Sequence, residues 1–245
     1  MEKKTNNTEY WLERTELLLG NEKLSRLQKA NVLIVGLGGV GAYAAEQICR
    51  AGVGKITIVD NDQVHSSNRN RQLIALVSTN GMDKADLMGR RLLDINPELD
   101  LTIIKKYIKD NLITEILEGD FDYVVDAIDT LTPKIYLIYE SLKKGLKIVS
   151  SMGASGKIDP MAIEITDISK SYNCTLARIL RKHLHRRGIR EGVRVVFSPE
   201  KHDKKSIIIT DDERNKKSTV GTISYMPPIF GSALASVVIR DIAGV

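Results

Sequence analysis

Short runs of apolar residues alternate with longer segments of helical periodicity over the first 150 residues of the chain. Runs rich in Val, Ile and Leu predict buried strands, whereas apolar residues at three- and four-residue spacing predict helices. Strands are expected at 32–35, 55–59, 101–105, 123–126 and 147–150, and helices at 40–51, 82–95, 112–117 and 134–143. This alternation favours an α/β fold built on a doubly wound, mostly parallel sheet.

Different patterns flank this alternation. Residues 10–29 have helical spacing with a break near Gly20 and Asn21, which predicts two short N-terminal helices. Beyond residue 151, strands are expected at 162–166, 193–198 and 206–210, a basic helix at 176–187 and an apolar helix at 229–242. The highly charged stretches 200–205 and 211–217 are expected to be mobile loops.

The last apolar segment, 229–242, is expected to pack in the core or in a dimer interface. It is too short for a membrane span and contains Arg240 and Asp241, so we predict no transmembrane helix. Peripheral contact with a membrane is the alternative.

A glycine-rich turn joins the first predicted strand to the first predicted helix, and its glycines are Gly36, Gly38, Gly39 and Gly41. Glycines let the backbone turn tightly and approach a phosphate, and the helix N-terminus offers N–H groups and a positive dipole end. A strand before the turn and a helix after it predict a Rossmann-like nucleotide site. Tight packing of strand against helix is the alternative role of the same glycines.

Asp60 and Asp62 end the second predicted strand. They lie about 20 residues after the turn, where a carboxylate is expected to meet the ribose hydroxyls of a nucleotide. A solvated strand end is the alternative interpretation of both residues.

Composition narrows the class of protein and its compartment. The 42% hydrophobic and 27% charged residues are typical of a soluble globular protein, and the net charge of +5 allows an acidic partner. The first seven residues lack the apolar region of a secretory signal, so we expect a cytoplasmic protein. Two cysteines, Cys49 and Cys174, are too few for a disulfide framework or a four-thiolate zinc site.

Four polar residues downstream of the turn separate an ordinary dehydrogenase from another class of enzyme. They are Asn68, Arg71, Lys84 and Asp129. An NAD-dependent oxidoreductase shares the glycine turn but gives no role to Arg71, Lys84 and Asp129. The ordered set resembles the adenylating superfamily that includes ubiquitin-activating enzymes and bacterial activators of sulfur-carrier proteins.

This resemblance implies a role for each position. The glycine turn and the acidic strand end would hold ATP, and Asn68, Arg71 and Lys84 would bind its phosphates. Asp129 would bind Mg²⁺, and Arg71, Lys84 and Asp129 would be catalytic. The set is chemically consistent, because attack on the α-phosphate requires cations and a metal that neutralise the other phosphates.

Arg14 occupies the place of an N-terminal arginine that, in members of this superfamily, reaches the phosphates of the neighbouring subunit. The resemblance therefore implies a catalytic role for Arg14 and a homodimer, since an arginine supplied in trans can stabilise phosphoryl charge strongly. A surface arginine on an amphipathic helix is the alternative.

Within the superfamily, the chain resembles the branch of tRNA threonylcarbamoyladenosine dehydratases. The stretches that carry this resemblance are 14–20, 151–160 and 219–228. Sulfur-carrier activators usually hold zinc with paired Cys-x-x-Cys motifs, which this chain lacks. We expect Cys49 to be packed in the core and Cys174 to be structural, with a reactive thiol at a helix N-terminus as the alternative for Cys174.

The resemblance implies adenylation of the threonyl carboxylate of the modified adenosine, followed by attack of the neighbouring carbamoyl group and loss of AMP. A tethered nucleophile of this kind removes the need for an enzyme thiol. Activation of a sulfur-carrier protein and a non-catalytic nucleotide-binding scaffold remain the alternative functions. A monovalent cation, Na⁺ or K⁺, near 151–156 and a sulfur-transfer protein partner are open expectations.

A basic run in the C-terminal part favours a tRNA partner, because such clusters bind phosphate backbones. Its candidate tRNA-binding residues are Arg178, Arg181, Lys182, Arg186, Arg187 and Arg190. A solvated helix face is the alternative. No linker divides the chain, so we predict one adenylating-enzyme domain of 1–245, with N-terminal helices in 1–30 and a nucleotide-binding core in 31–152. The remaining residues, 153–245, are expected to form a lobe that extends the sheet and serves the tRNA substrate and the dimer.

Overall fold

A seven-stranded sheet forms the centre of the computed structural model, which describes residues 10–109, 111–201, 207–213 and 216–245. The strand order is β3-β2-β1-β4-β5-β7-β6, and only β6 runs antiparallel to its neighbour. The strands are β1 (Asn31–Val35), β2 (Lys55–Val59), β3 (Asp100–Ile104), β4 (Tyr123–Asp126), β5 (Lys147–Ser151), β6 (Glu164–Asp167) and β7 (Arg194–Phe197). The doubly wound, mostly parallel sheet predicted from the sequence is confirmed.

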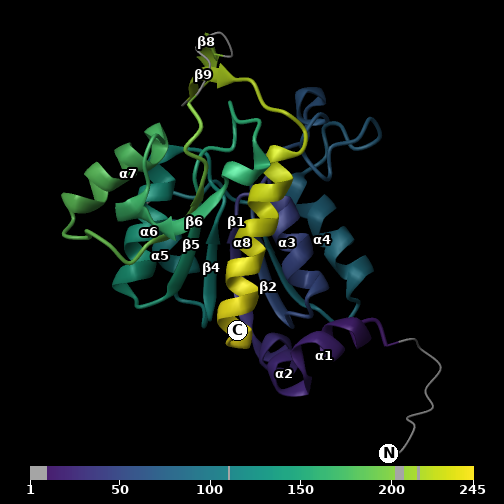
Figure 1. Ribbon diagram of the computed structural model, residues 1–245. Coiled ribbons are helices and arrows are strands. Elements are labelled where there is room, and N and C mark those ends of the chain that lie inside the picture. Colours follow the sequence, from purple (N-terminus) through teal and green to yellow (C-terminus); the bar gives the residue numbers. More distant parts are fainter. Residues whose placement is uncertain (1–9, 110, 202–206, 214–215) are drawn as a thin grey trace, which may run out of the picture.

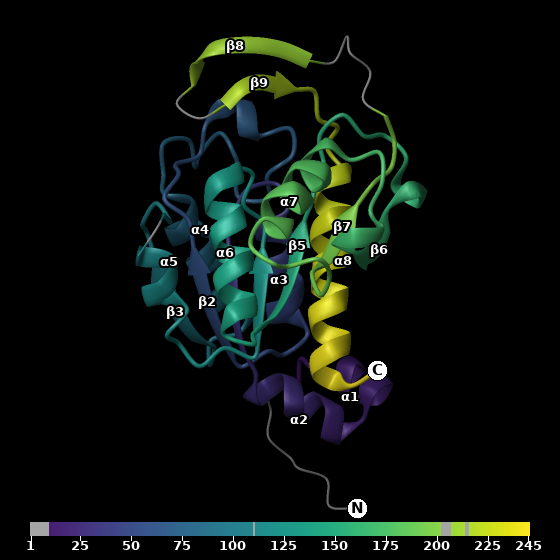
Figure 2. The same ribbon diagram turned by 90° about the vertical axis from the view of Figure 1, so that its left-hand side faces the viewer.

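Helices cover both faces of this sheet (Figures 1 and 2). One face packs against α2 (Asn21–Lys29), α3 (Gly41–Arg50), α4 (Lys84–Ile95) and α8 (Met226–Ala243), and the other against α5 (Asn111–Ile116), α6 (Leu131–Lys143) and α7 (Thr175–His185). Along β1, Val32 and Ile34 enter the first core whereas Leu33 and Val35 enter the second. Apolar side chains on both faces are what a covered parallel sheet requires.

Short elements complete the chain. The N-terminal helix α1 (Glu13–Leu19) is separated from α2 at Gly20, whose φ is 82°, so the predicted break is confirmed. Three 3₁₀ turns are η1 (Ser66–Asn68), η2 (Pro160–Ala162) and η3 (Ile168–Lys170). The expected strand at 162–166 is displaced, because Asp159 caps η2 and the strand begins only at Glu164.

The strand expected at 206–210 is present over its described residues as β8 (Ile207–Glu213). Two other expectations for this region were wrong, namely that the strand extends the central sheet and that 211–217 is a loop. The strands β8 and β9 (Lys216–Val220) pair only with each other in a separate antiparallel sheet, so β8 does not extend the central sheet. Most of the segment that we expected to be a loop is therefore paired strand, because backbone pairing with a facing segment overrides local charge. Residues 202–206, 214 and 215 lie outside the described part of the chain.

The final helix is longer than its apolar pattern suggested. Among the described residues, α8 is the one helix whose length of 18 residues and mean hydropathy of 1.3 would suffice for a membrane span, and half of it is buried. It begins before 229 because Pro227 and Pro228 lie in its first turn, where proline is tolerated. A Cβ on Gly231 would lie 2.4 Å from the Val40 carbonyl oxygen, so α8 packs tightly on the start of α3. The expected core packing is confirmed.

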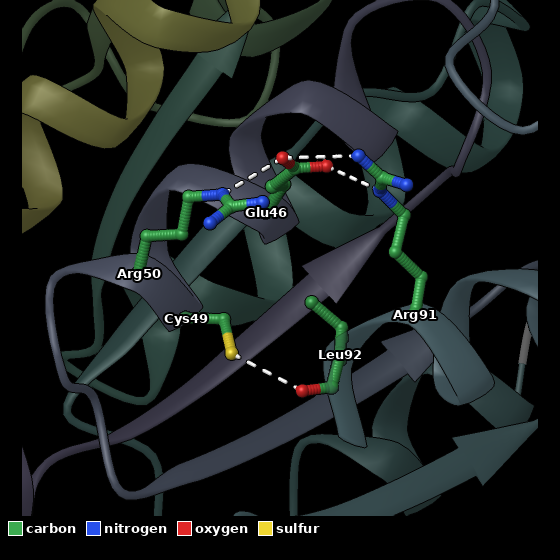
Figure 3. A network of polar contacts seen from close by, with 5 residues as sticks. All are labelled: Glu46, Cys49, Arg50, Arg91 and Leu92. Atoms are coloured by element: carbon green, nitrogen blue, oxygen red, sulfur yellow. Dashed lines mark hydrogen bonds and ion pairs between the residues drawn. The ribbon is translucent and has the colours of Figure 1, made fainter. Parts of the chain in front are cut away.

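A polar network ties α3 to α4 (Figure 3). The carboxylate of Glu46 accepts hydrogen bonds from Arg50 Nε at 2.8 Å and from the Nε and Nη2 atoms of Arg91. Burial raises the pKa of Glu46, but the hydrogen bonds and charges of the two arginines together outweigh it and lower the pKa. The network therefore keeps a nearly buried carboxylate ionised and fixes the helix that follows the glycine turn.

Cys49 lies beside this network and belongs to the core, as predicted. Its thiol is 3.6 Å from the Leu92 carbonyl oxygen, to which it donates (Figure 3). Burial raises the pKa of Cys49 to about 11, against a smaller lowering by Arg50. The thiol stays protonated at neutral pH and is a poor nucleophile there.

A fully buried ion pair closes the carboxyl end of β4. Lys134 Nζ lies 2.8 Å from Asp126 Oδ2, and both side chains are completely excluded from solvent. Asp126 also accepts hydrogen bonds from Ser150 Oγ at 2.6 Å and from the Ile128 backbone N–H at 3.1 Å, and Lys134 donates to the Ile128 carbonyl at 2.8 Å. Each charge thus has several partners, as a buried charge requires.

Replacing Lys134 with Met is expected to lower the free energy of unfolding by about 3–5 kcal/mol, because it leaves Asp126 buried without its counter-charge. Lys144→Met is the matched control, since Lys144 pairs with the exposed Glu118 at 2.7 Å and such surface pairs contribute about 0–1 kcal/mol. Urea-induced unfolding of both variants measures the difference. A loss below about 1 kcal/mol in Lys134→Met would show that the pair does not organise this region.

Candidate active site

Two glycines of the turn are required by packing. Gly36 has a φ of 90°, and a Cβ there would lie 2.8 Å from the Ala127 carbonyl oxygen. At Gly41 a Cβ would lie only 1.7 Å from the Gly36 carbonyl oxygen. Tight packing of the strand against the helix is therefore enough to explain why these two positions are glycine.

The other two glycines face different surroundings. A Cβ on Gly39 would lie 3.0 Å from Pro227 Cβ and 3.3 Å from the Arg71 carbonyl oxygen, so two distant segments meet the turn there. Around Gly38 the nearest atom to such a Cβ would be Gln72 Nε2 at 3.9 Å. Gly38 is therefore the point of the turn with room for a ligand to approach the backbone.

The acidic end of β2 braces the turn. Asp60 Oδ2 accepts a hydrogen bond from the Leu37 backbone N–H at 2.6 Å, and its Oδ1 accepts one from the Asp62 backbone N–H at 2.7 Å. Burial raises the pKa of Asp60, while the charge of Lys84 and these two hydrogen bonds oppose the rise. Lys84 is itself buried and lies 3.0 Å from Asp62 Oδ2. The structure therefore brings Asp60, Asp62 and Lys84 together at the turn.

The segment that follows η1 lies against the same turn. Asn68 is buried and its Oδ1 accepts a hydrogen bond from the His65 backbone N–H at 3.0 Å, so its amide shapes this segment. Arg71 donates from Nη1 to the Ser67 carbonyl at 2.8 Å and to Asn70 Oδ1 at 2.9 Å. The guanidinium is accessible to solvent at these contacts, so it is available to a phosphate at the mouth of the site.

Sequence reasoning missed Gln72, which follows Arg71. Its side chain is buried, and its Oε1 has no hydrogen-bond partner among the described residues. The position next to an arginine of the predicted phosphate-binding set was the available signal, but glutamine has no charge to mark it.

Asp129 lies on the loop that the Asp126–Lys134 pair holds. It is exposed and stands two residues beyond Ala127, whose carbonyl contacts Gly36. The carboxyl ends of β1, β2 and β4 thus bring the turn, the acidic residues and the Asp129 loop to one edge of the sheet, where ligands bind in open α/β sheets.

Arg14 is not brought to this edge within its own chain. Leu12, two residues before it, would touch a Cβ on Gly52 at 3.0 Å, which places α1 at the C-terminal end of α3. The turn lies at the N-terminal end of that helix, about 15 Å away along its axis. Figures 1 and 2 show α1 and α2 at the end of the molecule opposite the β8–β9 hairpin.

The basic residues of 178–190, which lie in α7 and just after it, divide into two groups. Arg181 donates to the carbonyls of Ile168 at 3.1 Å and Ser171 at 2.7 Å, and Arg187 lies 5.7 and 6.0 Å from the ring centroids of Tyr136 and Tyr139. These two guanidinium groups hold α7 to η3 and α6. The exposed residues of the run are Arg178, Lys182, Arg186 and Arg190.

Cys174 stands directly before α7 and is buried. Its carbonyl accepts the Arg178 backbone N–H at 3.0 Å, which closes the first turn of the helix. Burial favours the structural role expected for this thiol over the reactive one.

The sequence model of the ThiF family matches residues 12–245. The tRNA threonylcarbamoyladenosine dehydratase of Bacillus subtilis (strain 168) is 39% identical over 236 residues, which cover 94% of this chain and 93% of the relative. The enzyme of that name from Escherichia coli (strain K12) is 37% identical, with 71% of this chain and 66% of the relative covered.

A solved structure agrees over nearly the whole fold. The crystal structure of E. coli tRNA N6-threonylcarbamoyladenosine dehydratase, TcdA, in complex with ATP superposes with a TM-score of 0.86 at 31% sequence identity. The match covers 97% of this chain and 96% of that chain.

The glycines of the turn are expected to respond differently to the same substitution. Gly41→Ala forces a Cβ onto the Gly36 carbonyl, so we expect the free energy of unfolding to fall by at least about 3 kcal/mol, or the protein not to fold. Gly38→Ala meets no close atom, so its stability is expected to stay within about 1 kcal/mol of the wild type. Denaturant unfolding checks both, and equal stabilities would contradict the packing argument.

Proposed function

The chain belongs to the ThiF family, and from this premise we propose that it catalyses the ATP-dependent dehydration of threonylcarbamoyladenosine in tRNA. One observation carries the proposal. A glycine turn, Asp60, the buried Lys84 and the Arg71 segment meet at one sheet edge in a chain that matches dehydratases along nearly its whole length.

The chemistry has two steps. The threonyl carboxylate attacks the α-phosphorus of ATP, the bond to the β-phosphate breaks, and an acyl-adenylate and pyrophosphate form. The carbamoyl group of the same nucleoside then attacks the activated carbonyl carbon, AMP leaves with the carboxylate oxygen, and a ring closes with net loss of water. Because the nucleophile is already tethered beside the carbonyl, proximity replaces an enzyme nucleophile in the second step.

This chain's own residues would serve the first step. The open side of the turn at Gly38 and the N-terminus of α3 offer backbone N–H groups to the phosphates. Lys84 and Arg71 would supply positive charge, and Asp60 keeps the turn in place through the Leu37 N–H. These groups stabilise charge that grows on the phosphates during attack.

Mg²⁺ fits this arrangement through Asp129. Within the described residues, no group of three or more His, Cys, Asp or Glu side chains could hold a metal without other ligands. Mg²⁺ needs no such group, because it is commonly bound by one or two carboxylates together with substrate phosphates and water. When bound, the ion would neutralise phosphate charge, and the exposed carboxylate of Asp129 would hold it.

Arg14 would act on the site of a second copy of the chain. It lies at the far end of α3 from its own turn, so a role at the phosphates requires a partner subunit. The neighbouring Leu17 and Leu18 are 79% and 84% exposed, as expected for an apolar surface that a second subunit covers. We therefore propose a homodimer.

The remaining expectations belong to the same proposal. A cytoplasmic location suits an enzyme that acts on tRNA. The monovalent cation near 151–156 and a sulfur-transfer protein partner stay predictions. Activation of a sulfur-carrier protein remains the alternative, since it begins with the same adenylation step.

Incubation with ATP, Mg²⁺ and tRNA that carries threonylcarbamoyladenosine is expected to yield a nucleoside lighter by one water, together with AMP and pyrophosphate. Asp129→Ala is expected to lower kcat/KM at least about 100-fold without loss of stability. The exposed Asp94→Ala on α4 is the control and should retain activity. Mass spectrometry of the nucleosides measures turnover.

Two results would reject the assignment. Full activity of Asp129→Ala would remove the residue from the catalytic set. Pyrophosphate exchange that requires a carrier protein, with no change in the tRNA, would favour the alternative function.

The exposed basic face of α7 is expected to contact tRNA phosphates. Changing Lys182 and Arg186 together to Ala should weaken tRNA binding and reduce the slope of log affinity against log salt by about 2, roughly one per lost contact. Lys143 and Lys144, changed together to Ala at the end of α6, remove the same charge elsewhere and serve as the control. Filter binding over a salt series measures both, and equal slopes would exclude this face as the contact.

A further inference from the structure

The amide of Asn70 joins two parts of the candidate site. Its Oδ1 accepts a hydrogen bond from Arg71 Nη1 at 2.9 Å, and its Nδ2 donates one to the Thr222 carbonyl at 3.0 Å. The first contact holds the guanidinium to which the proposed function assigns phosphate binding. The second reaches a segment 152 residues away in the sequence.

That segment, 221–225, runs from the end of β9 to the start of α8, and we call it the connecting segment. The Gly221 carbonyl accepts the Gly156 N–H at 2.8 Å, and Thr222 Oγ1 donates to Ser155 Oγ at 2.9 Å. Tyr225 Oη donates to the Ile158 carbonyl at 2.8 Å. The connecting segment is therefore hydrogen-bonded along the loop that follows β5. It leads into α8, whose Pro227 lies close to Gly39 of the turn.

Asparagine suits this position for a chemical reason. A primary amide offers an acceptor for the guanidinium and a donor for a backbone carbonyl at the same time, which a carboxylate or a hydrocarbon side chain cannot do. Within the described part of the chain, the Arg71 guanidinium donates hydrogen bonds to the Ser67 carbonyl and to Asn70 Oδ1, and neither acceptor is a carboxylate. One of the two hydrogen bonds that orient the guanidinium is therefore made to the Asn70 amide.

We propose that Asn70 is a positioning residue, which orients Arg71 for the triphosphate of ATP and couples this contact to the connecting segment at the base of the β8–β9 hairpin. The proposal deepens the proposed function and rests on ATP as its nucleotide. When Arg71 engages the phosphates, the Asn70 amide is held as well, and its bond to the Thr222 carbonyl restrains the connecting segment. ATP binding thereby orders the loop after β5 in the same event.

A double-mutant cycle tests the first half of the proposal on the full-length protein. Asn70→Ala is expected to weaken Mg-ATP binding about five- to tenfold by calorimetry, because Arg71 loses its orientation. Combined with Arg71→Ala, it should add nothing further, since both changes remove one shared contact. Thr222→Val is the matched control, because it keeps the carbonyl that Asn70 uses and removes only the contacts of the hydroxyl with Ser155 Oγ and the Val220 carbonyl. Its ATP affinity should stay within about twofold of the wild type.

Hydrogen exchange tests the second part of the proposal, the coupling of ATP binding to the connecting segment. A purely structural role of Asn70 would not change the response of this exchange to ATP. At saturating Mg-ATP, exchange of the amides of 221–225 should slow in the wild type but not in Asn70→Ala. Additive effects in the cycle, or equal protection in both proteins, would overturn the proposal. Both measurements use ATP without tRNA, so they remain decisive even if the dehydration reaction itself fails.

Discussion

The buried pair of Asp126 and Lys134 is the constraint on which the site depends. Two charges without solvent contact are tolerable only when every polar atom has a partner, and here Ser150 and both backbone groups of Ile128 complete the set. Those bonds fix the backbone just beyond β4. Gly36 packs on the Ala127 carbonyl in that stretch, so the shape of the glycine turn follows from the ion pair.

The glycine turn also positions segments that are distant in the sequence. Its Leu37 N–H is held by Asp60 from β2, and its Gly39 is contacted by the Arg71 carbonyl and by Pro227 at the start of α8. Small residues make these approaches possible, since any Cβ at Gly36 or Gly41 would collide with backbone. The side chains that we propose for phosphate binding therefore lie on a frame built mainly from backbone contacts and buried charge.

Local patterns predicted the central sheet because each strand and helix carries its own periodicity. The Asp126–Lys134 pair was not predicted, because a lysine in an amphipathic helix is expected at the surface and only the fold shows that it is buried. The β8–β9 hairpin was missed for another reason: strand pairing is not local, and its charged stretch has the composition of a loop. Likewise Arg181 and Arg187 could be separated from their exposed neighbours only once Ser171 and Tyr136 were in place.

The state of the two thiols limits the chemistry that this site can perform. Burial raises the pKa of Cys49 to about 11, and Cys174 is enclosed at the start of α7, so neither is an accessible thiolate for a thioester. An adenylating enzyme without such a thiol must pass its activated carboxylate to a nucleophile that arrives with the substrate. A carbamoyl group on the same nucleoside meets that requirement by proximity. The protein then has to supply only nucleotide binding and charge stabilisation, which are the roles that we propose for the backbone frame, Lys84, Arg71 and Asp129.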